Sequence, residues 1–222
     1  MNPLLPSPLS LLPRTVAGIA LVALSVGAQA SLIVNGDFET GNLNGWTTYT
    51  TAGGTIGVPA VSAFDTSGAG ASNAAMFNVG RVIFGVGASQ EGGGLFQSFM
   101  FGGGMVNIAA DIAVLLNGGG RNLEGGLFSL LLDGSVVDSF DFGDVFLNVA
   151  ERSTLDYAGL LSAGNHELRF EITRGFTTGD VSPFQYLDNV VVTGGNQVPE
   201  PGTLALVGLA LAGVGWARRA TR

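Results

Sequence analysis

The chain of 222 residues carries a net charge of −8, contains no cysteine, and takes all nine of its basic residues from arginine. The lack of cysteine excludes disulfides, thiolate catalysis and Cys-His metal sites. Between residues 31 and 197, 5 arginines face 16 acidic residues, which leaves a net charge of −11. A surface this acidic repels nucleic acid and anionic lipid, so we exclude both as partners of the folded domain.

The first 30 residues have the pattern of a secretory signal peptide. Arg14 supplies a positive charge, an apolar stretch follows from Val16 to Val26, and Ala28-Gln29-Ala30 offers a small-x-small cleavage site. This order of charge, apolar run and small residues is what signal peptidase recognises. We therefore expect export, with cleavage after Ala30.

Residues 31–195 are expected to form one domain, long enough for a single sizeable core. Short alternating apolar runs recur and no helical period persists, which predicts an all-β, antiparallel, two-sheet β-sandwich. Asp133-Gly134 predicts a tight hairpin turn. The three glycine triplets are interpreted as flexible loops or bends: Gly92–Gly94, Gly102–Gly104 and Gly118–Gly120. The expected strands are Leu32–Val34, Ala74–Val79, Val82–Val86, Leu95–Phe101, Val106–Leu116, Leu127–Leu132, Ser135–Phe142, His166–Thr173 and Tyr186–Thr193.

The sequence offers little for catalysis. The single histidine, His166, shares strand parity with Leu168 and Phe170, which favours a structural role at a strand end. No Gly-x-Ser-x-Gly elbow occurs. We expect no catalytic residues. The open alternative is a glycan-active lyase or hydrolase that uses a carboxylate pair, with candidates among Asp133, Asp138, Asp141 and Asp144.

Aromatic side chains are candidates for contact with sugar rings. Trp46 follows Gly45 and is either a stacking platform or, more in keeping with its position, part of the core. Trp216 lies at the edge of the C-terminal apolar run, where interfacial tryptophan is common. Five further aromatics lie in or near expected loops and strand starts, and any of them could line a ligand surface: Tyr49, Tyr157, Phe176, Phe184 and Tyr186.

The tail, residues 196–222, has the pattern of a short membrane anchor. An apolar run reaches Ala217 and is followed by Arg218, Arg219 and Arg222. The 16 residues from Gly202 to Ala217 fall short of the about 20 that a spanning helix usually needs, but flanking arginines can snorkel. The positive-inside rule places these arginines in the cytoplasm. We expect a C-terminal transmembrane helix that stops transfer.

At Pro199-Glu200-Pro201, with the apolar run and the basic cluster of Arg218 and Arg219, the tail resembles the PEP-CTERM sorting signal of Gram-negative bacteria. The resemblance implies an exosortase-type membrane protease as partner, beside signal peptidase and the export machinery. It also implies transient anchoring in the inner membrane, trimming near the motif, and delivery to the cell surface or the exopolysaccharide and biofilm matrix.

A second resemblance covers most of residues 31–195. Asn35 to Glu39, Gly45-Trp46 and the segment Tyr186 to Val190 are similar to the galactose-binding-like jelly-roll superfamily, which includes many carbohydrate-binding modules. Gln97 and the segment Ala163 to Leu168 fit the same pattern. The resemblance implies one structural Ca²⁺, held by the backbone carbonyl of Asp37 and the side chains of Glu39 and Asp188. The alternative is that Asp37 caps a turn while the other two carboxylates are solvated.

Together these observations predict an exported surface or matrix protein whose β-sandwich is non-catalytic and contacts polysaccharide or serves as a structural component. A protein without any ligand is a further open possibility.

Overall fold

The computed structural model describes residues 31–81, 90–175 and 181–194. The expected signal peptide, the expected tail with its sorting motif, and the strand expected at Val82–Val86 lie outside these residues, as do Phe176 and Trp216. Within the described residues, no helix is long and apolar enough to cross a membrane.

The described residues form twelve strands, and every pairing between these strands is antiparallel, as the sequence predicted. In chain order the strands are β1 (Thr47–Thr50), β2 (Gly54–Thr55), β3 (Ala60–Phe64), β4 (Ser72–Phe77), β5 (Gly80–Arg81), β6 (Glu91–Leu115), β7 (Arg121–Asn122), β8 (Leu127–Leu132), β9 (Ser135–Asp141), β10 (Val145–Phe146), β11 (Ala150–Arg174) and β12 (Phe184–Gly194).

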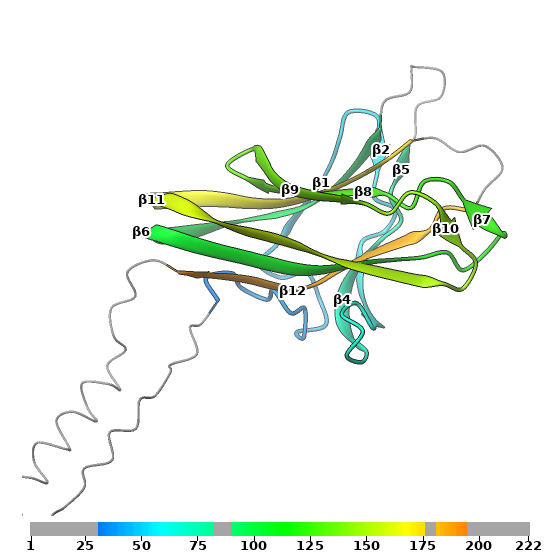
Figure 1. Cartoon of the computed structure of the whole chain (residues 1–222), viewed down its shortest axis with the longest axis horizontal. Helices are drawn as coiled ribbons and strands as arrows, with labels where there is room; N and C mark the ends of the chain where they lie inside the picture. Colours follow the sequence, from blue (N-terminus) through cyan, green and yellow to red (C-terminus); the bar gives the residue numbers. More distant parts are fainter. Residues whose placement is uncertain (1–30, 82–89, 176–180, 195–222) are drawn as a thin grey trace, which may run out of the picture.

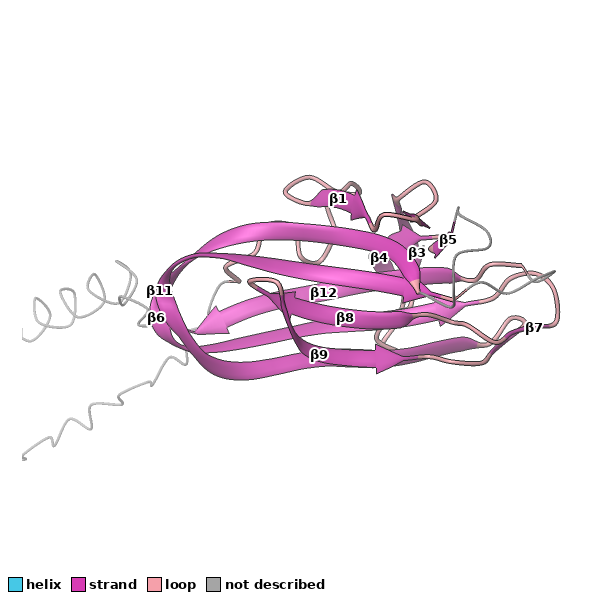
Figure 2. Ribbon diagram, turned by 90° about the horizontal axis from the view of Figure 1, so that it is seen from above, coloured by secondary structure: helices cyan, strands magenta, loops and turns pink. Residues whose placement is uncertain are grey.

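Two strands of 25 residues, β6 and β11, run through both layers of the molecule. They pair in one unbroken register, from Ala150 opposite Leu115 to Arg174 opposite Glu91. Figure 2 shows both strands turning over at one end, so that each contributes one half to each layer. β12 pairs with the second half of β6, and β4 and β3 follow β12 in the sheet. β1 pairs with the first half of β6. β8 pairs with the second half of β11, and β9 pairs with β8.

The turnover falls at the second glycine triplet. Gly103 and Gly104 adopt φ angles of +87° and +116°, a region that other residues enter only with strain. The interpretation of this triplet as a bend is therefore correct, but the bend lies inside one continuous strand. The strands expected at 95–101 and 106–116 are the two halves of β6. The first triplet, Gly92–Gly94, also lies within β6 rather than in a loop.

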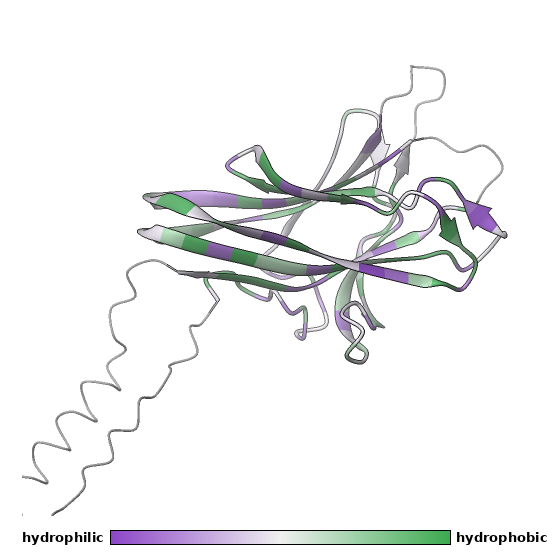
Figure 3. Ribbon diagram, viewed as in Figure 1, coloured by the Kyte–Doolittle hydropathy of each residue, from purple (hydrophilic) through white to green (hydrophobic). Residues whose placement is uncertain are grey.

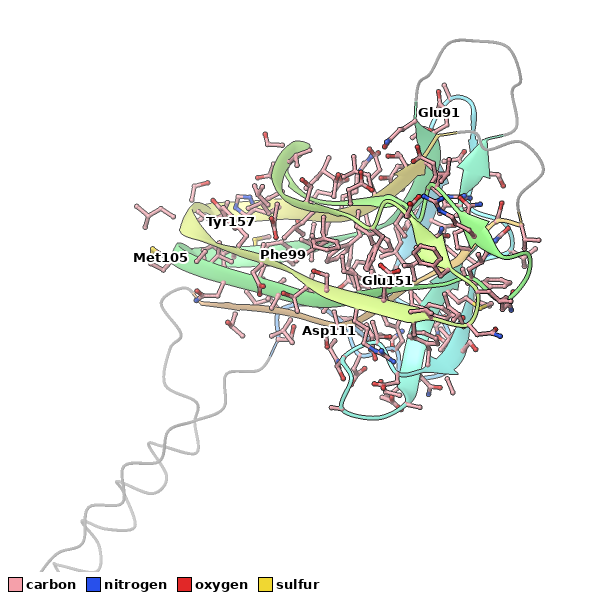
Figure 4. The ribbon with its side chains drawn as sticks, turned by 45° about the vertical axis from the view of Figure 1, so that its right-hand side comes forward. Glu91, Phe99, Met105, Asp111, Glu151 and Tyr157 are labelled. Carbon is pink, nitrogen blue, oxygen red and sulfur yellow. The ribbon has the colours of Figure 1, made fainter. Side chains whose placement is uncertain are left out.

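The core fills the space between the two layers. On β11, Leu168, Phe170 and Ile172 are buried as their alternation predicted, and they share one core cluster with Leu95, the cross-strand neighbour of Phe170, and with Ile112 of the second half of β6. Figure 4 shows Phe99 pointing into this space. Burial of these side chains in both layers is the main force that holds the two halves of the long strands together.

The hairpin between β8 and β9 confirms the turn prediction. Leu132 pairs with Ser135, and the two residues between them have φ angles of +50° at Asp133 and +77° at Gly134. Positive φ at both central positions is the geometry of the tight turn that matches strand twist.

Other expectations were wrong. The segment Leu32–Val34 is not a strand; it is fixed instead by a hydrogen bond from the Leu32 amide to the Val192 carbonyl. The short strands β1, β2, β3, β5, β7 and β10, and the first half of β11, were not predicted. That half-strand buries only Leu155 completely, so its sequence lacks the two-residue apolar period that marks a strand.

Candidate functional site: an acidic cluster and an open outer face

Two of the three predicted calcium ligands come together at the start of β4. The carboxylate of Asp188 on β12 accepts a 2.6 Å hydrogen bond from the Ser72 hydroxyl. The carboxylate of Glu39 accepts hydrogen bonds of 2.9 and 3.2 Å from the backbone and side-chain nitrogens of Asn73. Because Ser72 and Asn73 are adjacent, these hydrogen bonds link the first loop to the last strand through the start of β4. Gly36 adds a backbone bond of 2.8 Å from Val190.

The Asp188 carboxyl is fully buried. Burial raises the pKa of this carboxyl, and repulsion from Asp111 and Glu39 raises it further, although hydrogen bonds from Ser72 and the Asn189 amide oppose the shift. Asp111 is held nearby through its 2.7 Å bond from the Asn189 side chain. The alternative in which Asp188 is solvated is therefore wrong.

The carboxylates of this acidic cluster have the chemistry that binds a hard cation. A buried carboxylate with two further carboxylates nearby gains from a cation that neutralises the repulsion, and carboxylate oxygens are the ligands that Ca²⁺ prefers. Within the described residues, no three His, Cys, Asp or Glu side chains stand close enough to hold a metal by themselves. An ion bound here would therefore need backbone carbonyls or water beside Glu39 and Asp188.

The side chain of Asp37 caps a turn, which is the alternative to calcium binding given above. Its carboxylate accepts a 3.3 Å hydrogen bond from the backbone amide of Glu39, two residues on, and the side chain is exposed. The residue between them, Phe38, is fully buried at a φ of +52°. The side chain of Asp37 thus shapes the loop. Only its backbone carbonyl remains as the predicted ligand.

The four acidic residues considered for catalysis have separate partners. Asp133 binds His166 and the Glu167 amide. Asp138 accepts hydrogen bonds from the backbone amides of Ser139 and Asp156. Asp141 accepts one from the Gly143 amide, and Asp144 forms an ion pair with Arg121. The Asp138 contact joins the edge of β9 to the edge of β11, so this carboxylate helps to close one side of the sandwich.

His166 has the structural surroundings that its strand position predicted. The ring is buried between Phe99 and Phe101, with Nδ1 2.7 Å from a carboxylate oxygen of Asp133 and Nε2 3.0 Å from the Ser162 carbonyl. Both partners accept, so only a ring protonated on both nitrogens donates to both. Burial alone would raise the pKa of the Asp133 carboxyl, but hydrogen bonds from His166 and the Glu167 amide lower it overall.

The aromatic candidates separate into core and surface residues. Trp46 is buried, stacks on Phe38 at 5.9 Å between ring centroids, and donates from its indole nitrogen to the Asn35 carbonyl. Trp46 is therefore a core residue, not a stacking platform. Tyr186 is also buried and lies flat against Phe64 at 3.7 Å.

Two tyrosines reach the surface. Tyr49 donates a 3.0 Å hydrogen bond to Glu171 and lies beneath the guanidinium of Arg169, 4.4 Å from the ring centroid. Burial and the Glu171 charge raise the pKa of the Tyr49 hydroxyl. Tyr157 on β11 is half-buried and packs against the core cluster, between the exposed Asp156 and Ala158, which border a depression. Phe184 is half-buried against a small outer cluster that includes Tyr186.

The depression, about 290 Å³ in volume, lies on the outside of the layer formed by β12, β6 and the first half of β11. Cross-strand neighbours build it: Ala109 lies opposite Asp156 and Val191, and Asn107 lies opposite Ala158 and Thr193. The two alanines leave space between larger neighbours. We name this surface the outer face; its lining residues are Asn107, Ile108, Ala109, Asp156, Tyr157, Ala158, Val191 and Thr193.

Sequence reasoning named Tyr157 but missed the rest of the outer face. The only sequence signal is the alternation of small and polar residues at Asn107, Ala109 and Asp111, repeated at Asp156 and Ala158. That signal indicates an exposed strand face but does not show that two such runs lie side by side.

Comparison with known families identifies the tail. Residues 197–219 match the family described as the PEP-CTERM protein-sorting motif. The predicted motif residues Pro199, Glu200, Pro201, Arg218 and Arg219 all fall within the match. The chain therefore carries a PEP-CTERM sorting motif, which implies processing by an exosortase, export and sorting to the cell surface.

No curated protein matches the sequence. Solved structures similar to this chain include TmCBM61 in complex with β-1,4-galactotriose, at 12% identity, TM-score 0.43, and coverage of 73% of this chain and 97% of that one. They also include the xylan-binding domain from CBM 22, at 15% identity, TM-score 0.41, and coverage of 76% and 98%. A cyclase from Fischerella sp. TAU has 13% identity, TM-score 0.44, and coverage of 77% and 100%. Similarities this distant assign neither ligand nor reaction to this chain.

Proposed function

We propose that the protein is an exported surface or matrix component that contacts carbohydrate without catalysis, through the outer face of its sandwich. The sorting part of the proposal rests on the PEP-CTERM motif at residues 197–219. Signal peptidase removes residues 1–30. The apolar run of the tail then holds the chain in the inner membrane of a Gram-negative bacterium until an exosortase trims it near Pro199-Glu200-Pro201, and the sandwich joins the cell surface or the exopolysaccharide of a biofilm matrix.

The ligand part rests on the open depression of the outer face. It is lined by the small apolar side chains of Ala109 and Ala158, which alternate with the amide of Asn107 and the carboxylate of Asp156, and by the hydroxyl of Thr193. A sugar presents the same combination, with apolar ring faces and hydroxyl groups that both donate and accept. The acidic charge of the domain favours a neutral polysaccharide over an anionic one.

A structural calcium belongs to the same proposal. Glu39, Asp188 and the carbonyl of Asp37 would hold it, and the bound ion would supply positive charge that neutralises the acidic cluster. The residues of the chain perform the positioning: Ser72 and Asn73 orient the two carboxylates, and the Gly36–Val190 bond fixes the loop on β12.

The absence of catalysis is a proposal supported by the acidic side chains of the β8–β9 region. Asp133, Asp138 and Asp144 each hold together separate parts of the fold, which is a sufficient reason for their presence. The enzyme alternative predicts that the wild-type protein releases reducing ends from a polysaccharide and that Asp141→Asn abolishes the release. Release of products would refute the non-catalytic proposal.

A glycan array tests the ligand part. Ala158→Arg places a long side chain in the depression, so we expect it to lower binding by at least about tenfold, the change that 1.4 kcal/mol produces. Val58→Arg is the matched control, because Val58 is 86% exposed and does not line the depression. Equal binding by both variants would remove the outer face as the ligand site. No binding by folded wild-type protein would favour a structural component.

A further inference from the structure

The end at which β6 and β11 turn over exposes large apolar side chains. Met100, Met105 and Leu160 are 69%, 52% and 79% exposed. Met105 and Leu160 lie directly opposite each other on the two strands, and Figure 4 places Met105 at the extreme end of the molecule. We call these three residues and the glycines 102–104 between them the bend end.

The bend end is uncharged in an otherwise acidic domain. No Asp, Glu or Arg occurs in residues 99–110, 157–165 or 189–198, and the charges of Glu167, opposite Ser98, and of Asp133, which binds the Glu167 amide, flank this end on the side of Met100. Figure 3 shows near-white and green segments where the two long strands turn, beside a purple stretch of β11. The repulsion that excludes anionic lipid from the acidic surface is therefore weak around Met105 and Leu160, which form an exposed apolar pair, and Met100 adds a third exposed apolar side chain across the bend.

The described chain also stops at the bend end. Gly194, the last described residue, lies opposite Val106, and at the other terminus the Leu32 amide bonds to Val192. The apolar run of the tail begins at Leu204, ten residues after Gly194. Ten residues span at most about 35 Å when fully extended. The tail therefore leaves the sandwich at this end and keeps it close to the membrane.

We propose that, while the tail is anchored, the bend end rests on the lipid surface of the bilayer, with Met100, Met105 and Leu160 inserted among the headgroups. This inference rests on the anchoring step of the proposed function. Flexible methionines adapt well to such a fluid surface. The short connection keeps the patch at an effective concentration on the order of millimolar or more, so a weak contact is sufficient.

The contact would orient the protein for processing. Pro199 follows Gly194 by only five residues, so a bend end seated on the bilayer holds the sorting motif at the membrane surface, where a membrane-embedded protease acts. The far ends of the long strands, near Glu91 and Leu115, then point away from the membrane. Cleavage near the motif removes the tether, and the weak contact then releases the domain.

Single-cysteine labelling tests the contact, because the natural chain has no cysteine. The full chain is reconstituted in nanodiscs of zwitterionic lipid with Met100→Cys, Met105→Cys or Leu160→Cys, each labelled with an environment-sensitive dye. Val58→Cys is the matched control: it is 86% exposed, and the adjacent Gly57 packs on Asn78, whose side chain bonds to the Pro183 carbonyl at the far end of the sandwich. Ala210→Cys reports on the anchor itself.

We expect a lipid-borne quencher to act at least about twofold more strongly on the three bend-end dyes than on the Val58 dye, consistent with insertion of about 5–10 Å. Adding anionic lipid should weaken the effect. Quenching at Ala210 alone overturns the inference and leaves the anchoring step intact, whereas loss of quenching at Ala210 overturns both. A shift in dye fluorescence that grows with protein concentration and does not depend on lipid indicates pairing of two copies. That result would also overturn the proposal.

Discussion

The buried carboxylate of Asp188 accepts a 2.6 Å hydrogen bond from the hydroxyl of Ser72, which ties the last strand of the sandwich to the first residue of β4. The pKa of the Asp188 carboxyl is raised by burial and by the nearby Asp111 and Glu39 carboxylates. A raised pKa in an acid means that the folded state holds the proton more tightly than the unfolded state. Without a cation, stability should fall as pH rises from about 3.8 to the folded pKa, and stay lower above it.

Asp188→Asn removes the loss of stability that comes from ionising this buried carboxyl. In the presence of a chelator at pH 7, we expect the variant to melt about 3 °C or more above the wild type, the size of roughly 1 kcal/mol in a domain of this length. Excess Ca²⁺ should reverse the order, because it stabilises only the protein that keeps the carboxylate. Differential scanning calorimetry with EDTA and with Ca²⁺ measures both effects. Identical wild-type melts in the two conditions would remove the calcium proposal.

The bond between His166 and Asp133 should give the opposite pH dependence. The pKa of the Asp133 carboxyl is lowered, so its stabilising contribution is present above pH 3.8 and is lost as pH falls through the folded pKa. We expect Asp133→Asn to lower the free energy of unfolding by about 1 kcal/mol at pH 7 and by much less at pH 3. Urea unfolding at both pH values measures this. Asp141→Asn, which loses only a turn contact with Gly143, is the control and should change little.

The bend depends on the backbone of Gly103. Its φ is +87°, and an added Cβ would lie 3.2 Å from the Ala163 nitrogen. Gly103→Ala should therefore cost about 1–2 kcal/mol, measured by urea unfolding. Gly102→Ala is the matched control, because no atom lies within 4 Å of its added Cβ. Equal costs for the two variants would show that the bend does not require a glycine at position 103.

Trp46 should behave as a core residue rather than as a ligand platform. Trp46→Ala removes a buried ring that stacks on Phe38 and a hydrogen bond to Asn35, and we expect a loss of about 3–5 kcal/mol. Trp46→Phe keeps most of the ring and should cost less. If glycan binding by folded Trp46→Phe were abolished, the core assignment of this residue would be wrong.

Local pattern predicted the parts of the fold that are set by neighbouring residues. The Asp133-Gly134 turn and the alternation from His166 to Thr173 each report on one hairpin or one strand face, and both are correct. The bend could not be predicted as part of a single strand, because glycine triplets also occur in loops. Only the unbroken register between β6 and β11 shows that this triplet is a bend within one strand and not a loop between two strands.

The candidate site depended on information that a local pattern does not contain. Glu39 and Asp188 lie far apart in the chain, and the resemblance of the two segments, not their spacing, predicted that they meet. The outer face was missed because its floor, Ala109 and Ala158, comes from two small residues. Their adjacency requires the cross-strand register, which residue composition does not encode.

The most direct test of the central claim is the mass of the mature protein isolated from cells that carry an exosortase, with both termini sequenced. The account predicts a chain that begins at Ser31, ends near Pro199–Pro201, and is recovered from the cell surface or the matrix. A protein that stays in the cytoplasm and retains both Met1 and Arg222 would contradict it.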